Sequence, residues 1–121
     1  MGEYKVWVDK EGIIRAAIIG THDKDDAEKI IAEIDKLLEK YKQQSRLLID
    51  MTKTGRPTSK ARKVHASNMR IKAKYFKKTA LYGASAMNRV MANFIIKASG
   101  KGDNVKYFNT EHQALSWLNE N

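Results

Sequence analysis

The stretch Arg46-Leu47-Leu48-Ile49-Asp50-Met51 decides the fold class of this 121-residue chain. Its apolar centre is continuous rather than alternating, which is typical of a strand buried on both faces of a parallel sheet. Both faces of such a sheet are covered by helices that connect its strands. The stretch therefore predicts an α/β fold with residues 46–51 inside the sheet.

Helical patterns lie on both sides of this strand. Residues 24–42 repeat apolar side chains at helical spacing, and residues 59–75 carry a weaker apolar stripe that ends at Tyr75. Residues 79–83 are expected to form the next strand. Strand–helix–strand units make right-handed crossovers between parallel strands, so these strands should pair in parallel.

The N-terminal residues favour a hairpin instead. Residues 4–9 alternate like a strand, Gly12 can supply the positive φ of a turn, and residues 13–19 form a second apolar strand. Thr21 or Asp23 can then cap the helix that follows. The first strand is therefore expected to lie antiparallel to the second.

The C-terminal part of the chain supplies two more helices and a short strand at residues 105–108. Ser85 is expected to cap the first of these helices, whose broad apolar face should pack in the core. That face contains Met87, Val90, Met91, Phe94, Ile95 and Ala98. Thr110 and Gln113 have the spacing of a capping box for the last helix. That helix should dock on the core through Ala114, Leu115, Trp117 and Leu118.

The predicted element order is ββαβαβαβα, in a mixed sheet of four or five strands covered by helices. No internal repeat, low-complexity segment or linker interrupts this order. Residues 1–121 are therefore expected to form one α/β domain.

The composition limits the function classes. The chain has no cysteine, which excludes disulfides, thiolate metal ligands and cysteine nucleophiles. The first residues lack the apolar run of a signal peptide, and no apolar stretch approaches the roughly 20 residues of a membrane-spanning helix. We expect a cytoplasmic protein without a membrane span.

The net charge of +9 is concentrated in the middle of the chain. Residues 51–102 carry 13 basic and no acidic side chains, whereas residues 1–50 carry 9 basic and 11 acidic ones. Such asymmetry favours an anionic partner, although a basic surface that only keeps the protein soluble explains it about as well.

The arrangement of elements resembles the SpoIIAA-like, or STAS-like, family of small α/β domains. The matching stretches are the hairpin from Asp9 to Ile13, residues 46–50, residues 78–85, and residues 105–118. They match in architecture and hydrophobic pattern, and none is a chemical motif. The resemblance implies a protein-interaction or regulatory module rather than an enzyme. Some small members are suspected of binding small or lipidic ligands.

Anti-sigma-factor antagonists of this family carry a phosphorylatable serine at the start of the helix after the third strand. Thr58 and Ser59 fall in the matching region of this sequence. However, the stretch Arg56-Pro57-Thr58-Ser59 stands in place of the usual Asp-Ser-Ser-Gly signature. The resemblance therefore leaves phosphorylation of Thr58 or Ser59 open.

A candidate anion-binding site lies where the predicted parallel strands end. Ligands of open α/β sheets bind at this carboxyl edge, and the helix that begins near Ser59 offers free N–H groups there. The candidate residues are Thr52, Lys53, Arg56, Thr58, Ser59, Arg62 and Ser85. The alternative is an ordinary capped helix with a solvated basic loop, because Lys53-Thr54-Gly55 lacks the glycine spacing of a phosphate-binding loop.

A second candidate is a basic stripe on the outer side of the helix at residues 59–75. It consists of Lys60, Lys63, Arg70 and Lys74. It could contact an acidic protein, another subunit or a phosphate backbone. Nucleic acid is the weakest of these partners, because no nucleic-acid-binding signature is visible and the nearby Tyr75 is expected in the core.

No catalytic, metal or cofactor site is predicted. His22, His65 and His112 are scattered along the sequence, and Ser85 is adequately explained as a helix cap. We therefore predict a non-enzymatic STAS-like interaction or regulatory domain that binds an acidic protein or associates with itself. The alternatives are a small anionic or lipidic ligand at the carboxyl edge of the sheet, and nucleic acid.

Overall fold

The described strands of this protein form a five-stranded sheet in the spatial order β1-β2-β3-β4-β5. The computed structural model describes residues 3–40, 45–72, 75–99 and 103–120. Its elements are β1 (Glu3–Val8), β2 (Ile14–Ile19), α1 (Lys24–Lys40), β3 (Ser45–Asp50), α2 (Ser59–Lys72), β4 (Phe76–Tyr82), α3 (Ala86–Ser99), β5 (Val105–Phe108) and α4 (Glu111–Leu118). The predicted element order and the mixed α/β sheet are confirmed.

The β1–β2 hairpin is antiparallel, as predicted. Its turn requires a glycine at position 12, where φ is +79°. The Asp9 carboxylate fixes the same turn by accepting hydrogen bonds from the N–H groups of Glu11 and Ile13 at 2.8 and 3.0 Å. The chain thereby enters β2 with Ile13 and Ile14 pointing to opposite faces of the sheet.

Strands β2 to β5 are parallel, and β3 occupies the centre of the sheet. The apolar run in β3 is buried on both faces, as the sequence predicts. Leu47 packs with residues of α1, and Leu48 packs with residues of α4. Strand β4 begins at Phe76, three residues earlier than expected, because Phe76 pairs with Ser45 at the start of β3.

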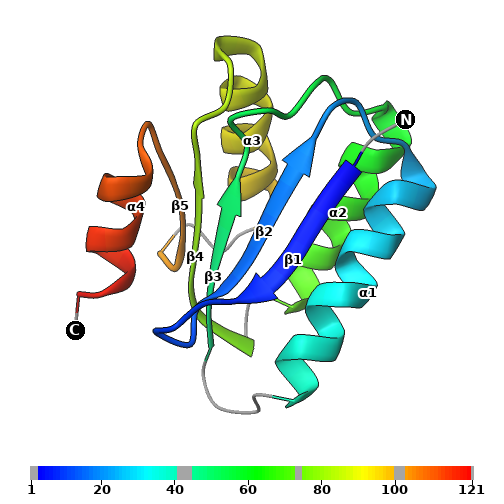
Figure 1. The fold of residues 1–121 in the computed structure, drawn as a ribbon. Coiled ribbons are helices and arrows are strands. Elements are labelled where there is room, and N and C mark those ends of the chain that lie inside the picture. The colour runs from blue at the N-terminus through cyan, green and yellow to red at the C-terminus, as the bar shows by residue number, and fades with distance from the viewer. Residues whose placement is uncertain (1–2, 41–44, 73–74, 100–102, 121) are drawn as a thin grey trace.

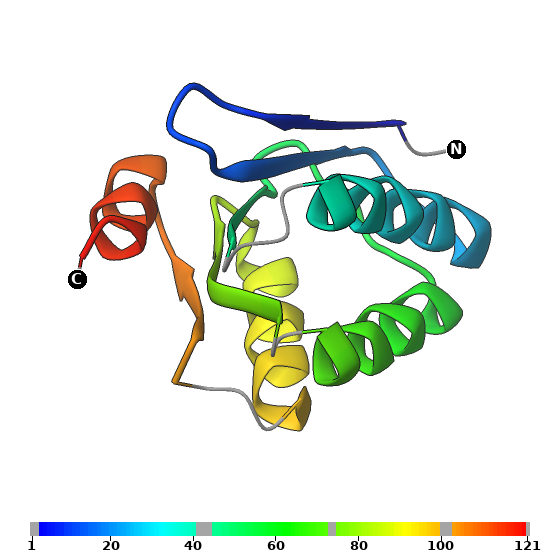
Figure 2. The ribbon, with the colours of Figure 1, turned by 90° about the horizontal axis from the view of Figure 1, so that it is seen from below.

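The helices are divided unequally between the two faces of the sheet. Figures 1 and 2 show α1, α2 and α3 on one face and α4 alone on the other. Within the described residues, α2 packs mainly on α1 and α3 and makes few contacts with any strand. Its apolar stripe is weak, so little hydrophobic free energy draws it onto the sheet.

Two sequence-based expectations about burial are wrong. Tyr75 is 48% exposed, and the neighbouring Phe76 fills the core in its place. The α3 residues Met87, Val90 and Phe94 are 58%, 67% and 72% exposed. The inward side of α3 is formed instead by Asn88, Ala92 and Ile96, which recur every four residues.

The polar side chain of Asn88 determines this orientation of α3. Its amide group donates hydrogen bonds to the backbone oxygens of Thr54 and Gly55, both at 3.0 Å. These bonds satisfy a polar group that is only 4% exposed. Because Asn88 must face inward, the more apolar stripe of α3 is rotated toward solvent.

Candidate binding site

A surface groove lies between α2 and α3, with a volume of about 990 Å³. The exposed side chains of Met87, Val90 and Phe94 line it on the α3 side. Arg56 and Lys63 line it on the α2 side. A monomeric protein rarely leaves neighbouring large apolar side chains in water, so an exposed apolar groove marks a site of association. We call this feature the α2–α3 groove.

The electrostatic surroundings of the α2–α3 groove are positive. The sequence from 51 to 102 contains no acidic residue. Arg62 lines the groove as well and donates a hydrogen bond to the Ser59 hydroxyl at 3.0 Å. In the described part of the chain, no ion pair involves Arg56, Arg62 or Lys63. These cations are therefore available to an anionic partner.

A smaller interior cavity of about 110 Å³ lies beneath α2, between that helix and the sheet. Apolar side chains dominate its lining, including Ile30, Leu47 and Leu81. Arg62 and Met91 line both the interior cavity and the α2–α3 groove. The Arg62 Nη1 atom lies 3.2 Å from the Met91 sulfur, so this pair forms part of the wall between the two spaces.

Two histidines meet at the edge of the interior cavity. The Nε2 atoms of His22, after β2, and His65, in α2, are 3.0 Å apart. Burial lowers the pKa of His22, with a partial offset from the carboxylates of Asp26 and Asp23. Burial, and then the charge of His22, lowers the pKa of His65 to about 4. At neutral pH both rings are therefore uncharged, and one N–H donates to the other ring.

The sequence-predicted anion-site residues do not all converge. Arg56, Ser59 and Arg62 meet at the α2–α3 groove, whereas Thr52, Lys53, Thr58 and Ser85 do not line it. Three of the hydroxyl groups make local bonds. The Thr52 hydroxyl donates to Asp50 at 2.7 Å. The hydroxyl oxygens of Thr58 and Ser85 accept from N–H groups of α2 and α3 and so cap these helices.

The predicted basic stripe is only partly described. Lys60 and Lys63 are exposed on α2, and Arg70 also belongs to this helix. Lys74 lies outside the described residues. The nearby Lys78 has a structural role instead. Its Nζ atom donates to the carbonyl oxygens of Trp117 and Glu120, at 2.6 and 3.1 Å, and thereby binds the C-terminal end of α4.

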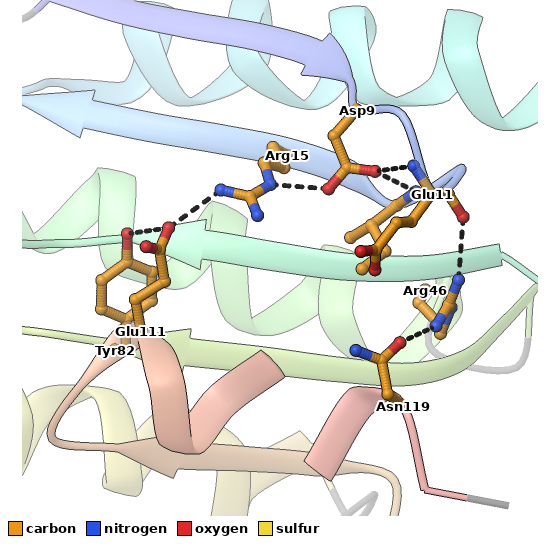
Figure 3. Close-up of polar contacts among 8 residues, drawn as sticks. Asp9, Glu11, Arg15, Arg46, Tyr82, Glu111 and Asn119 are labelled. Carbon is orange, nitrogen blue, oxygen red and sulfur yellow. Dashed lines mark hydrogen bonds and ion pairs between the residues drawn. The ribbon is translucent and has the colours of Figure 1, made fainter. Parts of the chain in front are cut away.

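On the face of the sheet that α4 covers, a polar network joins α4 to the β1–β2 hairpin (Figure 3). The Arg15 guanidinium forms ion pairs with Asp9 and Glu111, both at 2.9 Å. Burial opposes ionisation of Asp9, but hydrogen bonds from Ile13, Arg15 and Glu11 outweigh it and lower its pKa. The hairpin turn, which Asp9 fixes, and the contact of Arg15 with Glu111 of α4 explain the charged groups of this network.

Two arrangements considered from the sequence, a metal site and a histidine–serine pair, can be compared with the described residues. Over residues 3–40, 45–72, 75–99 and 103–120, no group of three potential metal ligands comes together. His22 pairs with His65 rather than with Ser59 or Ser85, so the nucleophile–base arrangement considered from the sequence is not formed. In the same residues, no helix has the length and apolar character needed to cross a membrane.

The exposed residues of α3 are the part of the candidate site that sequence reasoning missed. The sequence predicts Met87, Val90 and Phe94 in the core because they belong to a broad apolar face of their helix. Asn88 is the signal that could have corrected this expectation. A buried amide there, with bonds to a neighbouring loop, turns Met87, Val90 and Phe94 outward.

The strand order and the placement of the helices define an α/β domain of the STAS-like class. The SpoIIAA-like family profile matches residues 13–119, and the chain belongs to the SpoIIAA-like family. The match begins one residue before β2, so the edge strand β1 lies outside it. No curated protein matches the chain in sequence.

Solved structures support the same fold. An uncharacterised protein with a SpoIIAA-like fold from Shewanella loihica PV-4 is 18% identical, with a TM-score of 0.72 over 97% of this chain and 93% of that one. The anti-sigma factor antagonist SpoIIAA, in its unphosphorylated form, is 14% identical, with a TM-score of 0.66 over 96% of this chain and 97% of that one.

Proposed function

We propose that this chain is a non-enzymatic regulatory domain that binds a partner protein through the α2–α3 groove. The observation that carries the proposal is the exposure of Met87, Val90 and Phe94 beside Arg56 and Lys63, which form no ion pair within the described residues. The structurally similar SpoIIAA is named as an antagonist of another protein, an anti-sigma factor, which supports a protein-binding role.

The energetic argument concerns the three exposed apolar side chains. Each exposes apolar surface to water, and full burial of such a side chain contributes about 1.5–3 kcal/mol of favourable free energy. The fold cannot bury them by rotating α3 inward, because that rotation would break the hydrogen bonds of Asn88. A bound partner would recover this free energy, and Arg56 and Lys63 would select an acidic one.

The test is site-specific photo-crosslinking in the cells that express the protein. A photoreactive amino acid replaces Phe94 in the α2–α3 groove or, as the matched control, the exposed Ser116 on α4. The expected result is a discrete protein adduct from position 94 that is absent at position 116. Equal adducts at both positions, or none at position 94, would contradict the proposal.

A small anionic or lipidic ligand is the second candidate function. The observation that favours it is the interior cavity, which shares Arg62 and Met91 with the α2–α3 groove. A cavity of about 110 Å³ approaches the roughly 150 Å³ that suffices to bind benzene in an engineered apolar site. Fatty acids or alkyl phosphates should then raise the melting temperature, and Ala92→Ile, which narrows the cavity, should remove that shift.

A further inference from the structure

We infer that the α2–α3 groove accepts an acidic amphipathic helix of the partner protein. This inference rests on the proposed protein-binding function and specifies the chemistry and shape of the partner. It follows from three properties of the groove: its form, the spacing of its apolar residues, and its charge.

The form of the groove fits a rod. Its walls are two neighbouring helices, α2 and α3, which contact each other on the same face of the sheet as α1 (Figure 2). A helix with its side chains is about 10 Å wide and rises 5.4 Å per turn, so a volume of about 990 Å³ accommodates roughly two turns. A lipid bilayer is a poorer fit, because it receives convex apolar surfaces and leaves a concave one unfilled.

The apolar residues that α3 contributes to the groove have the spacing of a helix face against which a second helix can pack. Met87, Val90 and Phe94 stand three and four residues apart, on one side of α3. A partner helix laid along this side presents apolar residues at the same recurring positions, as in helix-in-groove recognition. An extended or irregular segment would fill the groove less completely.

The charge of the groove selects an acidic helix. Arg56, Arg62 and Lys63 line it, and no carboxylate of the described residues pairs with them. Among the helices that the structure describes, a second copy of this chain offers no matching element. Its most acidic helix is α1, and the apolar side of α1 is already buried through Ile30 and Ile34.

Methionine methyl groups provide a test that separates the groove from the cavity. Met87 lines only the α2–α3 groove, Met51 lines only the interior cavity, and Met91 lines both. The probe is a synthetic peptide of about 18 residues, or five turns, of leucine, glutamate and alanine with leucines on one side. The control peptide has the same composition with its leucines on all sides. Methyl NMR spectra of the ¹³C-methionine protein are recorded with each peptide.

The expected result is saturable shifts of the Met87 and Met91 signals with the amphipathic peptide and an unchanged Met51 signal. Lys63→Glu should raise the peptide Kd about fivefold, and the matched charge reversal Lys29→Glu on α1 should leave it unchanged. Equal shifts with the control peptide would overturn the inference, because charge alone would then explain binding.

Two further outcomes would also overturn it. One is an unshifted Met87 signal at saturating peptide. The other is a Met87 response to phosphatidylglycerol vesicles and not to the peptide, which would indicate a membrane surface. If the peptide fails while the crosslink at position 94 still captures a protein, the helix inference is wrong and the protein-binding function stands.

Discussion

The Nε2 atoms of His22 and His65 are 3.0 Å apart and join the loop after β2 to α2. This contact matters because α2 makes few contacts with the strands among the described residues. The rings are arranged edge to face, with centroids 5.2 Å apart. The hydrogen bond needs an uncharged acceptor nitrogen on one ring, so it exists only while at least one ring is neutral.

Acidification should weaken the fold through this pair. Burial holds the pKa of His65 at about 4 and lowers that of His22, whereas both have ordinary values near 6.5 in the unfolded chain. As the pH falls from 6.5 to about 4, the unfolded chain binds protons that the folded chain does not. The free energy of unfolding should therefore fall over this window, by up to about 1.4 kcal/mol per pH unit for His65, and the lowered pKa of His22 acts in the same direction.

Urea unfolding at pH 7, 6 and 5 measures this effect. His65→Gln removes one titrating ring and should flatten the dependence on pH. His112→Gln changes an exposed histidine of α4 and should preserve it. Identical slopes for the two variants would show that the buried pair does not control acid stability.

Substitutions of Lys78 and Lys77 should differ in their effect on the free energy of unfolding, although the two residues are neighbours in β4. The Lys78 Nζ atom binds two carbonyl oxygens at the C-terminal end of α4 and lies 4.9 Å from the centre of the Trp117 ring. Lys78→Gln should therefore lower the free energy of unfolding by about 1–2 kcal/mol. Lys77 is exposed, so Lys77→Gln should change it by less than about 0.5 kcal/mol. Thermal or urea unfolding of the pair gives the comparison, and equal losses would contradict the structural role of Lys78.

Local signals in the sequence were sufficient for most of the fold. The Leu47-Leu48 pair predicts a strand buried on both faces, because each face of a strand receives alternate residues. Helix caps are also local. Asp23, Ser85 and Thr110 each accept a hydrogen bond from an N–H group three residues later, at the start of α1, α3 and α4. One half of the expected capping box differs, since Gln113 accepts from Asn109 rather than from Thr110.

Contacts between distant residues explain what the sequence did not reveal. The rotation of α3 depends on bonds from Asn88 to a loop more than 30 residues earlier. The two histidines are 43 residues apart and belong to different elements. No pattern within one helix or strand reports such pairings, so the α2–α3 groove and the histidine contact needed the folded structure.

Gly83 should be far less tolerant of substitution than Gly12. Both have positive φ, +82° and +79°, which costs alanine about 1 kcal/mol in either place. A Cβ at Gly83 would overlap the Cγ2 atom of Thr52, whereas a Cβ at Gly12 would meet nothing within 4 Å. Gly83→Ala should therefore lower the free energy of unfolding by about 3 kcal/mol, and Gly12→Ala by about 1 kcal/mol.

The double variant Gly83→Ala/Thr52→Ser isolates the steric part of this cost. Serine lacks the Cγ2 atom and keeps the hydroxyl that donates to Asp50. Chemical denaturation should show that it recovers the difference between the two glycine variants. A double variant no more stable than Gly83→Ala would mean that backbone strain, not the contact with Thr52, dominates.

Phe94 should be dispensable for folding and required for binding. Its side chain is 72% exposed, so Phe94→Ser should change the free energy of unfolding by less than about 0.5 kcal/mol. Phe76 is 6% exposed and packs between the sheet and α1, so the same change there should cost about 3–5 kcal/mol. Calorimetry measures both stabilities, and titration with the amphipathic acidic peptide measures the binding of the folded Phe94→Ser protein. A large loss of stability in Phe94→Ser would mean that this side chain belongs to the core after all, and undiminished peptide binding would remove it from the interface.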